Sequence, residues 1–233
     1  MIIMKLEKFR FLGIIPARVG NQTVKNKNTV IIKNKRLIEY TLESSKKSKL
    51  LDDIIVSTNS KKIKEISNNF NINCPFLRPK KLASKFSHIS ETLKFSLVKY
   101  ERMVKKKFDY VVMLQPTSPK RQIGEIDRCI NKIIKYKANS LISIVELDEP
   151  HPFKLKKIKK NYVYPYIRGA KDNLPRQKLE KLYAPSGNVY IFSRKLILQK
   201  KLSSKDMLFD LINIKNYLNI NNEIDILKAK ILL

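Results

Sequence analysis

The chain has 233 residues, and its 49 lysine and arginine residues against 20 aspartate and glutamate residues give a formal net charge of +29. Hydrophobic residues make up 43% of the chain, enough for a continuous core, which excludes an intrinsically disordered protein. This length indicates one domain with room for one sizeable insertion.

The expected elements alternate between short apolar segments and stretches of helical periodicity, a pattern typical of a mostly parallel α/β sheet. The first part of the chain has a strand Phe11–Pro16, a helix with Leu37, Ile38 and Leu42 inward, a strand Asp53–Ser57 and a helix with Ile63, Ile66 and Phe70 inward. An extended piece Cys74–Leu77 follows, then a helix with Leu93, Leu97, Tyr100 and Val104 inward, a strand Tyr110–Leu114 and a helix with Ile126, Ile130, Ile133 and Ile134 inward. The last expected elements are the strands Ser140–Val145 and Asn188–Phe192 and a final helix Glu223–Leu232.

The alternation breaks between residues 146 and 183, where the chain is polar and punctuated by proline. Tyr162, Tyr164 and Tyr166 recur at every second position there and share one face of an extended ribbon. A departure this long is too large for an ordinary connection, so we expect an insertion of about residues 146–183 within a domain of residues 11–233.

The remaining features indicate a soluble cytoplasmic protein. No stretch approaches the roughly 18 apolar residues of a membrane-spanning helix. Residues 1–10 carry four charged side chains and no small-residue cleavage site, so we expect an N-terminal extension, not a signal peptide. Cys74 and Cys129 lie in or beside apolar segments and are expected to be buried thiols.

The positive charge raises the possibility of nucleic-acid binding, because basic surfaces attract phosphate backbones. However, 39 of the basic residues are lysine, whereas base-edge recognition favours arginine, and they are spread along the whole chain. We therefore expect anionic small-molecule substrates and consider nucleic acid an unlikely partner.

Ligands of open α/β sheets bind beyond the carboxyl ends of the strands, which selects the loops after Pro16, around Asn59 and after Leu114. The first of these loops carries Arg18, Lys27 and Asn28 but has neither a P-loop nor a Gly-x-Gly-x-x-Gly pattern. Such a loop either binds an anionic nucleotide through its side chains or is only a solvated connection.

The loop after Leu114 begins Gln-Pro-Thr-Ser-Pro, and its two prolines fix the backbone. It presents Gln115, Thr117 and Ser118 beyond a buried strand. This turn suits recognition of a polar ligand, although a tight strand-to-helix connection has the same features.

Eight segments occur together in a recognisable order. They are Ile15–Arg18, Lys27-Asn28, Val56–Thr58, Leu77–Pro79 with Leu82–Ser84, Leu114–Pro119, His151–Lys154, Pro175–Gln177 and Gly187–Ile191. In this order and spacing the chain resembles the acylneuraminate cytidylyltransferases, also called CMP-N-acetylneuraminic acid synthetases, from about Phe11 to Leu232.

The resemblance implies a Rossmann-like nucleotidyltransferase sheet flanked by helices, with a small extended insertion for dimerisation. It implies a reaction in which CTP and a nine-carbon 3-deoxy-2-keto sugar acid give a CMP-sugar and pyrophosphate, with Mg²⁺ as cofactor. The expected assembly is a homodimer in which the insertion of one copy contacts the active site of the other.

The resemblance also implies residue roles. The expected catalytic residues are Arg18, Lys27 and Gln115. The expected nucleotide contacts are Arg18, Lys27, Asn28, Arg78 and Ser84. The expected sugar contacts are Gln115, Thr117, Ser118, Lys154, Arg168, Arg176 and Gln177, with Lys154 and Arg168 coming from the partner subunit.

The chain departs from the family pattern where acidic or basic residues are usual. Gln22 replaces a lysine, and Asn59, Lys85, Asn219 and Asn221 replace aspartates. The last two stand where an Asp-x-Asp pair holds the metal, so the metal ligands are expected to be Asn219 and Asn221, in degenerate form, with Asp225 nearby. Two hypotheses follow: a working or weakened enzyme, or a catalytically silent homologue that keeps the fold and binds nucleotide or sugar.

Overall fold

The computed structural model describes residues 9–20, 24, 26–147, 150–170 and 174–233. Gln22 and most of the N-terminal extension therefore lie outside the described residues, as does the side chain of Arg176.

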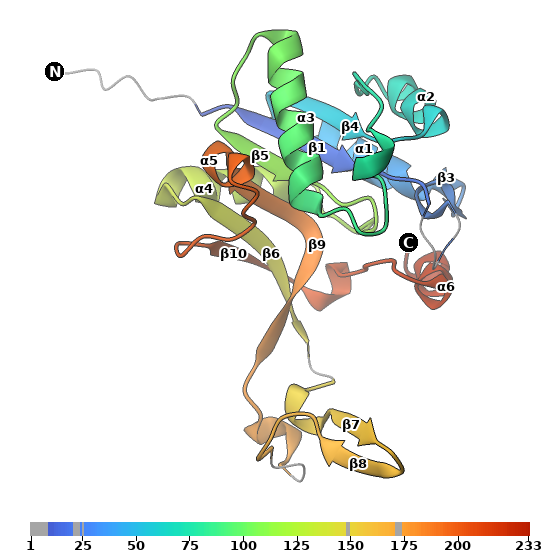
Figure 1. Ribbon diagram of the computed structural model, residues 1–233, viewed down its shortest axis with the longest axis vertical. Helices are drawn as coiled ribbons and strands as arrows, with labels where there is room; N and C mark the ends of the chain where they lie inside the picture. Colours follow the sequence, from blue (N-terminus) through green and yellow to red (C-terminus); the bar gives the residue numbers. More distant parts are fainter. Residues whose placement is uncertain (1–8, 21–23, 25, 148–149, 171–173) are drawn as a thin grey trace, which may run out of the picture.

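A six-stranded sheet forms the centre of the molecule, with strand order β10-β6-β9-β5-β1-β4 (Figure 1). Its strands are β1 (Phe11–Pro16), β4 (Asp53–Ser57), β5 (Tyr110–Met113), β6 (Ser140–Leu147), β9 (Leu182–Ser193) and β10 (Leu208–Ile212). The β1–β4, β1–β5 and β6–β10 pairs are parallel, whereas β9 runs antiparallel to both of its neighbours. The expected mostly parallel α/β sheet is thus confirmed.

Helices cover both faces of the sheet. They are α1 (Leu37–Lys46), α2 (Lys61–Asn69), α3 (Ile89–Val104), α4 (Glu125–Tyr136) and α5 (Arg194–Leu198). A sixth helix, α6 (Glu223–Leu232), packs instead in a separate cluster with Ile32 and Leu37. Side chains of β1 alternate between two cores: Phe11 and Ile15 pack with α1, α2 and α4, while Leu12 and Ile14 pack with α3 and α5. Burial on both faces explains why the strands read as continuous apolar runs.

Short elements complete the chain. They are the pair β2 (Ile31–Ile32) and β3 (Lys35–Arg36) and the 3₁₀ turns η1 (Lys27–Thr29), η2 (Lys80–Leu82), η3 (Pro152–Lys154), η4 (Arg176–Lys178) and η5 (Ile214–Asn216). Some sequence expectations were wrong in detail: Val104 on α3 and Ile134 on α4 are exposed, and β9 begins at Leu182 instead of Asn188. On α6 only Ala229 is buried, and Ile224, Leu227 and Ile231 face solvent.

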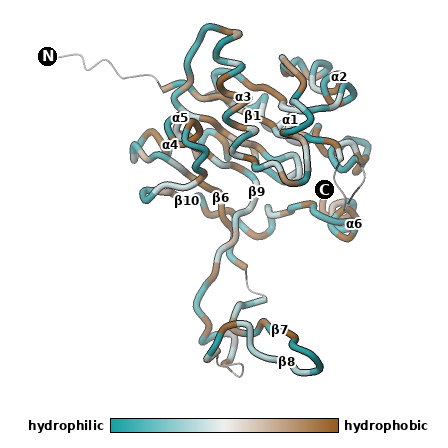
Figure 2. The backbone as a smooth tube through the Cα atoms, viewed as in Figure 1, coloured by the Kyte–Doolittle hydropathy of each residue, from teal (hydrophilic) through white to brown (hydrophobic). Residues whose placement is uncertain are grey.

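The insertion projects from one edge of this body (Figure 1). Strands β6 and β9 continue together beyond the sheet as a two-stranded neck, up to the pair Leu147 and Leu182. At its end lies the hairpin of β7 (Lys156–Lys159) and β8 (Tyr162–Pro165), which carries hydrophobic residues (Figure 2). Of the residues described between 152 and 185, none is buried.

Candidate functional site

A cavity of about 270 Å³ opens beyond the carboxyl ends of β1 and β5. It is lined by Pro16, Arg18, Lys27, Asn28, Arg78, Ile89, Gln115, Pro116, Thr117 and Asn221. Three of these side chains are cationic and none is acidic, so the cavity attracts anions. The structure thus brings together predicted residues that lie up to about 200 positions apart in the sequence.

Two arginines line the cavity and are fixed by backbone carbonyls. Arg18 Nη1 donates to the carbonyl oxygens of Ser84 (2.6 Å) and Ala83 (3.3 Å). Arg78 is buried and donates to both the hydroxyl and the carbonyl of Ser57. Burial, together with the charge of Arg18, lowers the pKa of Arg78 to about 10, which leaves it protonated at neutral pH.

Ser84 was expected to contact the nucleotide, but it is absent from the cavity lining. Its carbonyl accepts from Arg18, and its hydroxyl pairs with that of Ser87 at 2.9 Å. In this position Ser84 orients Arg18.

The first loop places a lysine and an amide beside the arginines. Lys27 Nζ donates to the carbonyl of Ile220 at 3.0 Å, and Asn28 Nδ2 donates to the carbonyl of Arg18 at 2.9 Å. Asn26 precedes them in the left-handed region, which asparagine tolerates well. Burial lowers the pKa of Lys27 and Arg18 lowers it further, while Asp225 acts in the opposite direction.

The Gln-Pro-Thr-Ser-Pro loop forms the opposite side of the cavity. The amide of Ile220 donates to the carbonyl of Thr117 at 2.8 Å, which ties residues 219–221 to this loop. Gly187, at φ +84°, approaches so closely that a Cβ there would lie 2.5 Å from Ser118 Oγ and 2.8 Å from Gln115 Oε1. Glycine is therefore required at this contact.

Ser118 does not line the cavity, although it was expected to contact the sugar. Its side chain is fully buried, and its hydroxyl donates to the carbonyl of Ser186 at 3.4 Å. The tight turn directs it into the core, so its observed contact is structural.

The expected metal ligands do not form an acidic centre. Asn221 lines the cavity, but Asn219 Oδ1 is buried and has no hydrogen-bond partner among the described residues. The Asp225 carboxylate accepts from the amides of Asn221 (2.8 Å) and Asn222 (3.1 Å) and caps α6. No group of three His, Cys, Asp or Glu side chains suitable for a metal occurs in the described part of the chain.

Magnesium prefers carboxylates. Two neutral amides and one carboxylate engaged in a helix cap do not fit a protein-held Mg²⁺ site. Asn59, where the resemblance leads us to expect an aspartate, accepts through its Oδ1 from the amide of Val19 at 3.0 Å. That contact needs only a carbonyl oxygen, so an aspartate is not required there.

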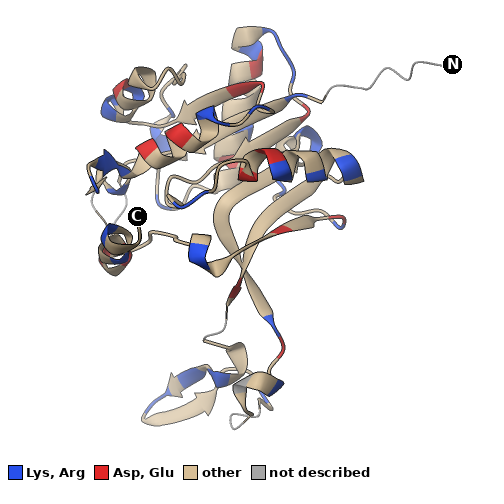
Figure 3. Cartoon of the chain, turned by 180° about the vertical axis from the view of Figure 1, so that it is seen from behind, with Lys and Arg blue, Asp and Glu red and all other residues tan. Residues whose placement is uncertain are grey.

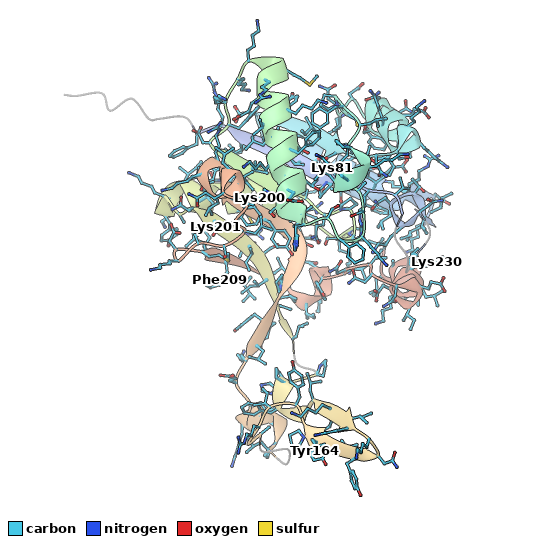
Figure 4. All side chains as sticks on the ribbon, viewed as in Figure 1. Lys81, Tyr164, Lys200, Lys201, Phe209 and Lys230 are labelled. Atoms are coloured by element: carbon cyan, nitrogen blue, oxygen red, sulfur yellow. The ribbon has the colours of Figure 1, made fainter. Side chains whose placement is uncertain are left out.

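The predicted sugar contacts of the insertion whose side chains the structure describes do not line this cavity within one chain. Lys154 belongs to η3, Arg168 follows β8, and Gln177 lies in η4. Gln177 lines a second cavity of about 370 Å³, together with His151 and Glu146. Figure 4 shows Tyr164 on the same projecting hairpin, at the far end from the body.

Sequence reasoning assigned no role to Arg121 or Gly187. Arg121 is 6% exposed and hydrogen-bonds to the carbonyl of Gln115. Its position immediately after the Gln-Pro-Thr-Ser-Pro-Lys segment was the only signal. Basic side chains otherwise occur on both the body and the hairpin (Figure 3), so charge did not single it out.

The sheet and its cationic cavity define a Rossmann-like nucleotidyltransferase fold. The profile of a family described as "Cytidylyltransferase" matches residues 12–200. The chain therefore belongs to the cytidylyltransferase family. No helix among the described residues has the length and apolarity to cross a membrane.

Curated relatives carry related names. The chain is 30% identical over 193 residues to CMP-N,N'-diacetyllegionaminic acid synthase of Legionella pneumophila, covering 82% of each protein. It is 25% identical to pseudaminic acid cytidylyltransferase of Campylobacter jejuni, covering 81% of each. An N-acylneuraminate cytidylyltransferase of Streptococcus agalactiae is 30% identical, over 81% of this chain and 44% of that protein.

Solved structures support the fold. CMP:2-keto-3-deoxy-manno-octonic acid synthetase complexed with CTP superposes with a TM-score of 0.69 at 14% identity, covering 96% of this chain and 98% of that one. A 4-diphosphocytidyl-2C-methyl-D-erythritol synthase gives a TM-score of 0.66 at 13% identity, over 97% and 98%.

Proposed function

We propose that this protein joins CTP to a nine-carbon 3-deoxy-2-keto sugar acid, releasing pyrophosphate. The observation that carries the proposal is the convergence of Arg18, Lys27 and Arg78 on one cavity that also exposes Gln115. The names of the relatives support the substrate class, since they include legionaminic, pseudaminic and N-acylneuraminic acids. Both proposed substrates are anions, which suits a cavity without acidic lining.

In the proposed reaction the anomeric hydroxyl of the sugar acid attacks the α-phosphate, and the bond to pyrophosphate breaks. Negative charge then moves onto the leaving oxygens. Arg18 and Lys27 stabilise that charge because they are held in place before the reaction begins. Arg78 and Asn28 contribute to nucleotide binding, while Gln115 and Thr117 orient the sugar.

The magnesium ion expected from the family stays a proposal, and the protein contributes little to its binding. Its oxygen ligands would come from the triphosphate, because Asn219 and Asn221 carry no charge. The roles proposed above are therefore those of the chain's own cationic and amide side chains.

We further propose that the enzyme acts as a cytoplasmic homodimer. The sugar acid in the cavity of the second copy would then be contacted by Lys154, Arg168, Arg176 and Gln177. The basic residues among them would pair with the carboxylate of the sugar acid. The support is the projection of the hairpin and its exposed apolar residues (Figures 1 and 4).

A second candidate is a homologue that binds nucleotide without catalysing transfer. The amides at Asn219 and Asn221 favour it, because they leave the cavity without metal-binding carboxylates while the cations remain.

One assay separates the two candidates. Purified protein is incubated with CTP, Mg²⁺ or Mn²⁺ and a panel of 3-deoxy sugar acids, and pyrophosphate release is measured. Release with at least one acid supports the enzyme. CTP binding without release supports the silent homologue, and absence of both overturns the proposal.

The Arg18→Ala variant identifies the cavity as the site. We expect its CTP affinity to fall by about 10- to 100-fold, because it removes a charge-assisted contact. Arg102→Ala is the matched control, since Arg102 is exposed on α3 and does not line the cavity. Equal affinities of the two variants would place the nucleotide elsewhere.

A further inference from the structure

The backbone carbonyl of Gln115 accepts hydrogen bonds from the buried side chains of Arg121 and Thr41 and, within its own loop, from the amide of Ser118 at 3.3 Å. Arg121 Nη2 lies 3.1 Å from this oxygen, and Thr41 Oγ1 lies 3.3 Å from it. Gln115 lines the cavity, whereas Arg121 and Thr41 are buried and do not. These two side chains therefore act on the cavity only through the loop.

Arg121 links this loop to two other elements. Its Nε donates to the carbonyl of Asn188 in β9 at 2.7 Å. Its Nη1 donates to the hydroxyls of Thr41 (3.2 Å) and Ser44 (3.0 Å) on α1. The planar fork of arginine can reach three elements at once, which the single ammonium of lysine cannot do in the same geometry.

The side chain of Gln115 is confined on its other side by Gly187. This glycine is the residue before Asn188, whose carbonyl accepts from Arg121. A Cβ at Gly187 would lie 2.8 Å from Gln115 Oε1, so β9 packs directly against the amide. One buried guanidinium thus fixes both the carbonyl of Gln115 and the strand against which its side chain packs.

A guanidinium in this place costs free energy. Burial lowers the pKa of Arg121 to about 10, with Glu125 acting in the opposite direction, and it stays charged at neutral pH. Its hydrogen-bond partners are carbonyls and hydroxyls, and among the described residues it forms no ion pair, although the buried carboxylate of Glu125 is near enough to favour its charge. A packing role alone would be met by an apolar side chain at lower cost.

We propose that Arg121 is the positioning residue for Gln115, which it aims into the cavity by bonding the loop carbonyl together with Thr41. This inference rests on the proposed function, in which Gln115 orients the sugar acid. Arg121 itself touches neither substrate.

Two variants test the proposal without removing bulk. Arg121→Lys keeps the charge but not the fork, and Thr41→Val keeps the shape but not the hydroxyl. Ser45→Ala is the matched control, because this buried hydroxyl on the same helix bonds to the carbonyl of Leu42 within α1 and to no other described residue. Folding of each variant is checked by thermal unfolding.

For Arg121→Lys and Thr41→Val we expect kcat/KM for the sugar acid to fall on the order of 10- to 100-fold, since misplacement by about 1 Å has this effect. The Kd for CTP should change less than about threefold, because Arg18, Lys27 and Arg78 are untouched. Hydrogen exchange of the backbone amides of Gln115, Thr117 and Ser118 should accelerate by about tenfold or more, with β5 unaffected. The control should match the wild type in all three measurements.

A parallel loss of CTP affinity, sugar turnover and stability would overturn the proposal, because it would indicate general damage. Unchanged exchange at these three amides would also overturn it. If the wild type itself shows no turnover, the proposed function fails while the exchange measurement still tests the positioning role. If the Arg121→Lys variant does not fold, the same measurements on the Thr41→Val variant decide whether the proposal holds.

Discussion

The body of the molecule and its insertion differ most in how far their apolar side chains are buried. In the body, Leu12, Ile14 and Val111 are completely buried between sheet and helices. In the insertion, Ile158 is 78% exposed and Val163 is 64% exposed, although they face each other across β7 and β8. An isolated two-stranded hairpin is marginally stable in water, so the insertion needs a second surface that the body does not need.

The predicted substrate contacts are also distributed over both regions. The cationic cavity belongs entirely to the body, whereas Lys154 and Arg168 belong to the insertion. Nucleotide binding should therefore survive changes in the insertion, while sugar transfer should not. The predictions below test this division, from the largest expected effect to the smallest.

The largest effect is expected from a charge on the hairpin. Ile158→Asp places a carboxylate opposite Val163, which would be desolvated in any apolar interface. We expect loss of the proposed homodimer by sedimentation velocity and a fall in pyrophosphate release of about 100-fold or more, with the Kd for CTP unchanged.

The control for this variant is Ile123→Asp, since Ile123 is an equally exposed isoleucine of the body. A dimer that persists in Ile158→Asp, or dissociates as readily in the control, would contradict the assignment of the hairpin to the interface. A monomeric wild type with full activity would contradict the division of contacts itself.

The second prediction concerns a buried charge that belongs only to the body. Glu101 is 2% exposed and accepts from Arg194 Nε (2.9 Å), Arg194 Nη2 (3.0 Å) and the amide of Phe108 (3.0 Å). Glu101→Gln should lower the free energy of unfolding by about 2–3 kcal/mol, below the usual cost for a fully buried pair because Arg194 is partly exposed. Urea unfolding measures it, with Glu65→Gln on the exposed surface of α2 as the control.

The pH dependence of stability provides a further check on Glu101. Burial works to raise the pKa of its carboxyl, but the bonds from Arg194 and Phe108 outweigh it, and the pKa lies below its ordinary 4.5. The stabilisation is therefore complete above about pH 4.5 and is lost as pH falls through the lower folded-state pKa. The Glu101→Gln variant should lose less free energy of unfolding than the wild type as the pH falls through this range. If both lose the same amount, the loss of stability in acid comes from other groups.

Sequence patterns predicted β1, β4 and β5 well, and β9 and β10 less well. The runs that become β1, β4 and β5 are apolar and continuous, because both faces are buried. Strand β10 was missed since Asp210 interrupts it, and that aspartate is bound by Arg128 of α4. The first half of β9 was missed because it leaves the sheet and alternates as part of the neck.

The cavity could be predicted where strand ends and motif resemblance coincided, as for Arg18, Lys27 and Gln115. Arg121 could not, because its role depends on α1, β9 and the loop after β5 meeting in space. Ser118 was assigned to the sugar because residues of one loop look equivalent in sequence. Only the structure shows that Ser118 turns into the core, where it bonds to the carbonyl of Ser186, while Gln115 and Thr117 line the cavity.

The smallest predicted effect is a pH dependence of CTP binding that belongs to the body alone. Burial, aided by Arg18, lowers the pKa of Lys27 from its ordinary 10.5. The triphosphate binds the protonated lysine, so loss of that charge should raise the Kd for CTP by about tenfold, beginning at a lower pH than for an ordinary lysine. Calorimetry on Lys27→Arg should show a flatter profile, because a guanidinium stays protonated longer.

Lys62→Arg, an exposed substitution on α2, is the control and should keep the wild-type profile. If the Kd of the Lys27→Arg variant for CTP still rises near pH 10, we attribute that rise to deprotonation of Arg78, whose pKa is about 10. Ile158→Asp should also keep the wild-type profile, since no titrating group of the hairpin lines the cavity. Equal slopes in Lys27→Arg and the wild type would exclude Lys27 as the titrating contact, and an altered slope in Ile158→Asp would mean that the nucleotide site extends into the insertion.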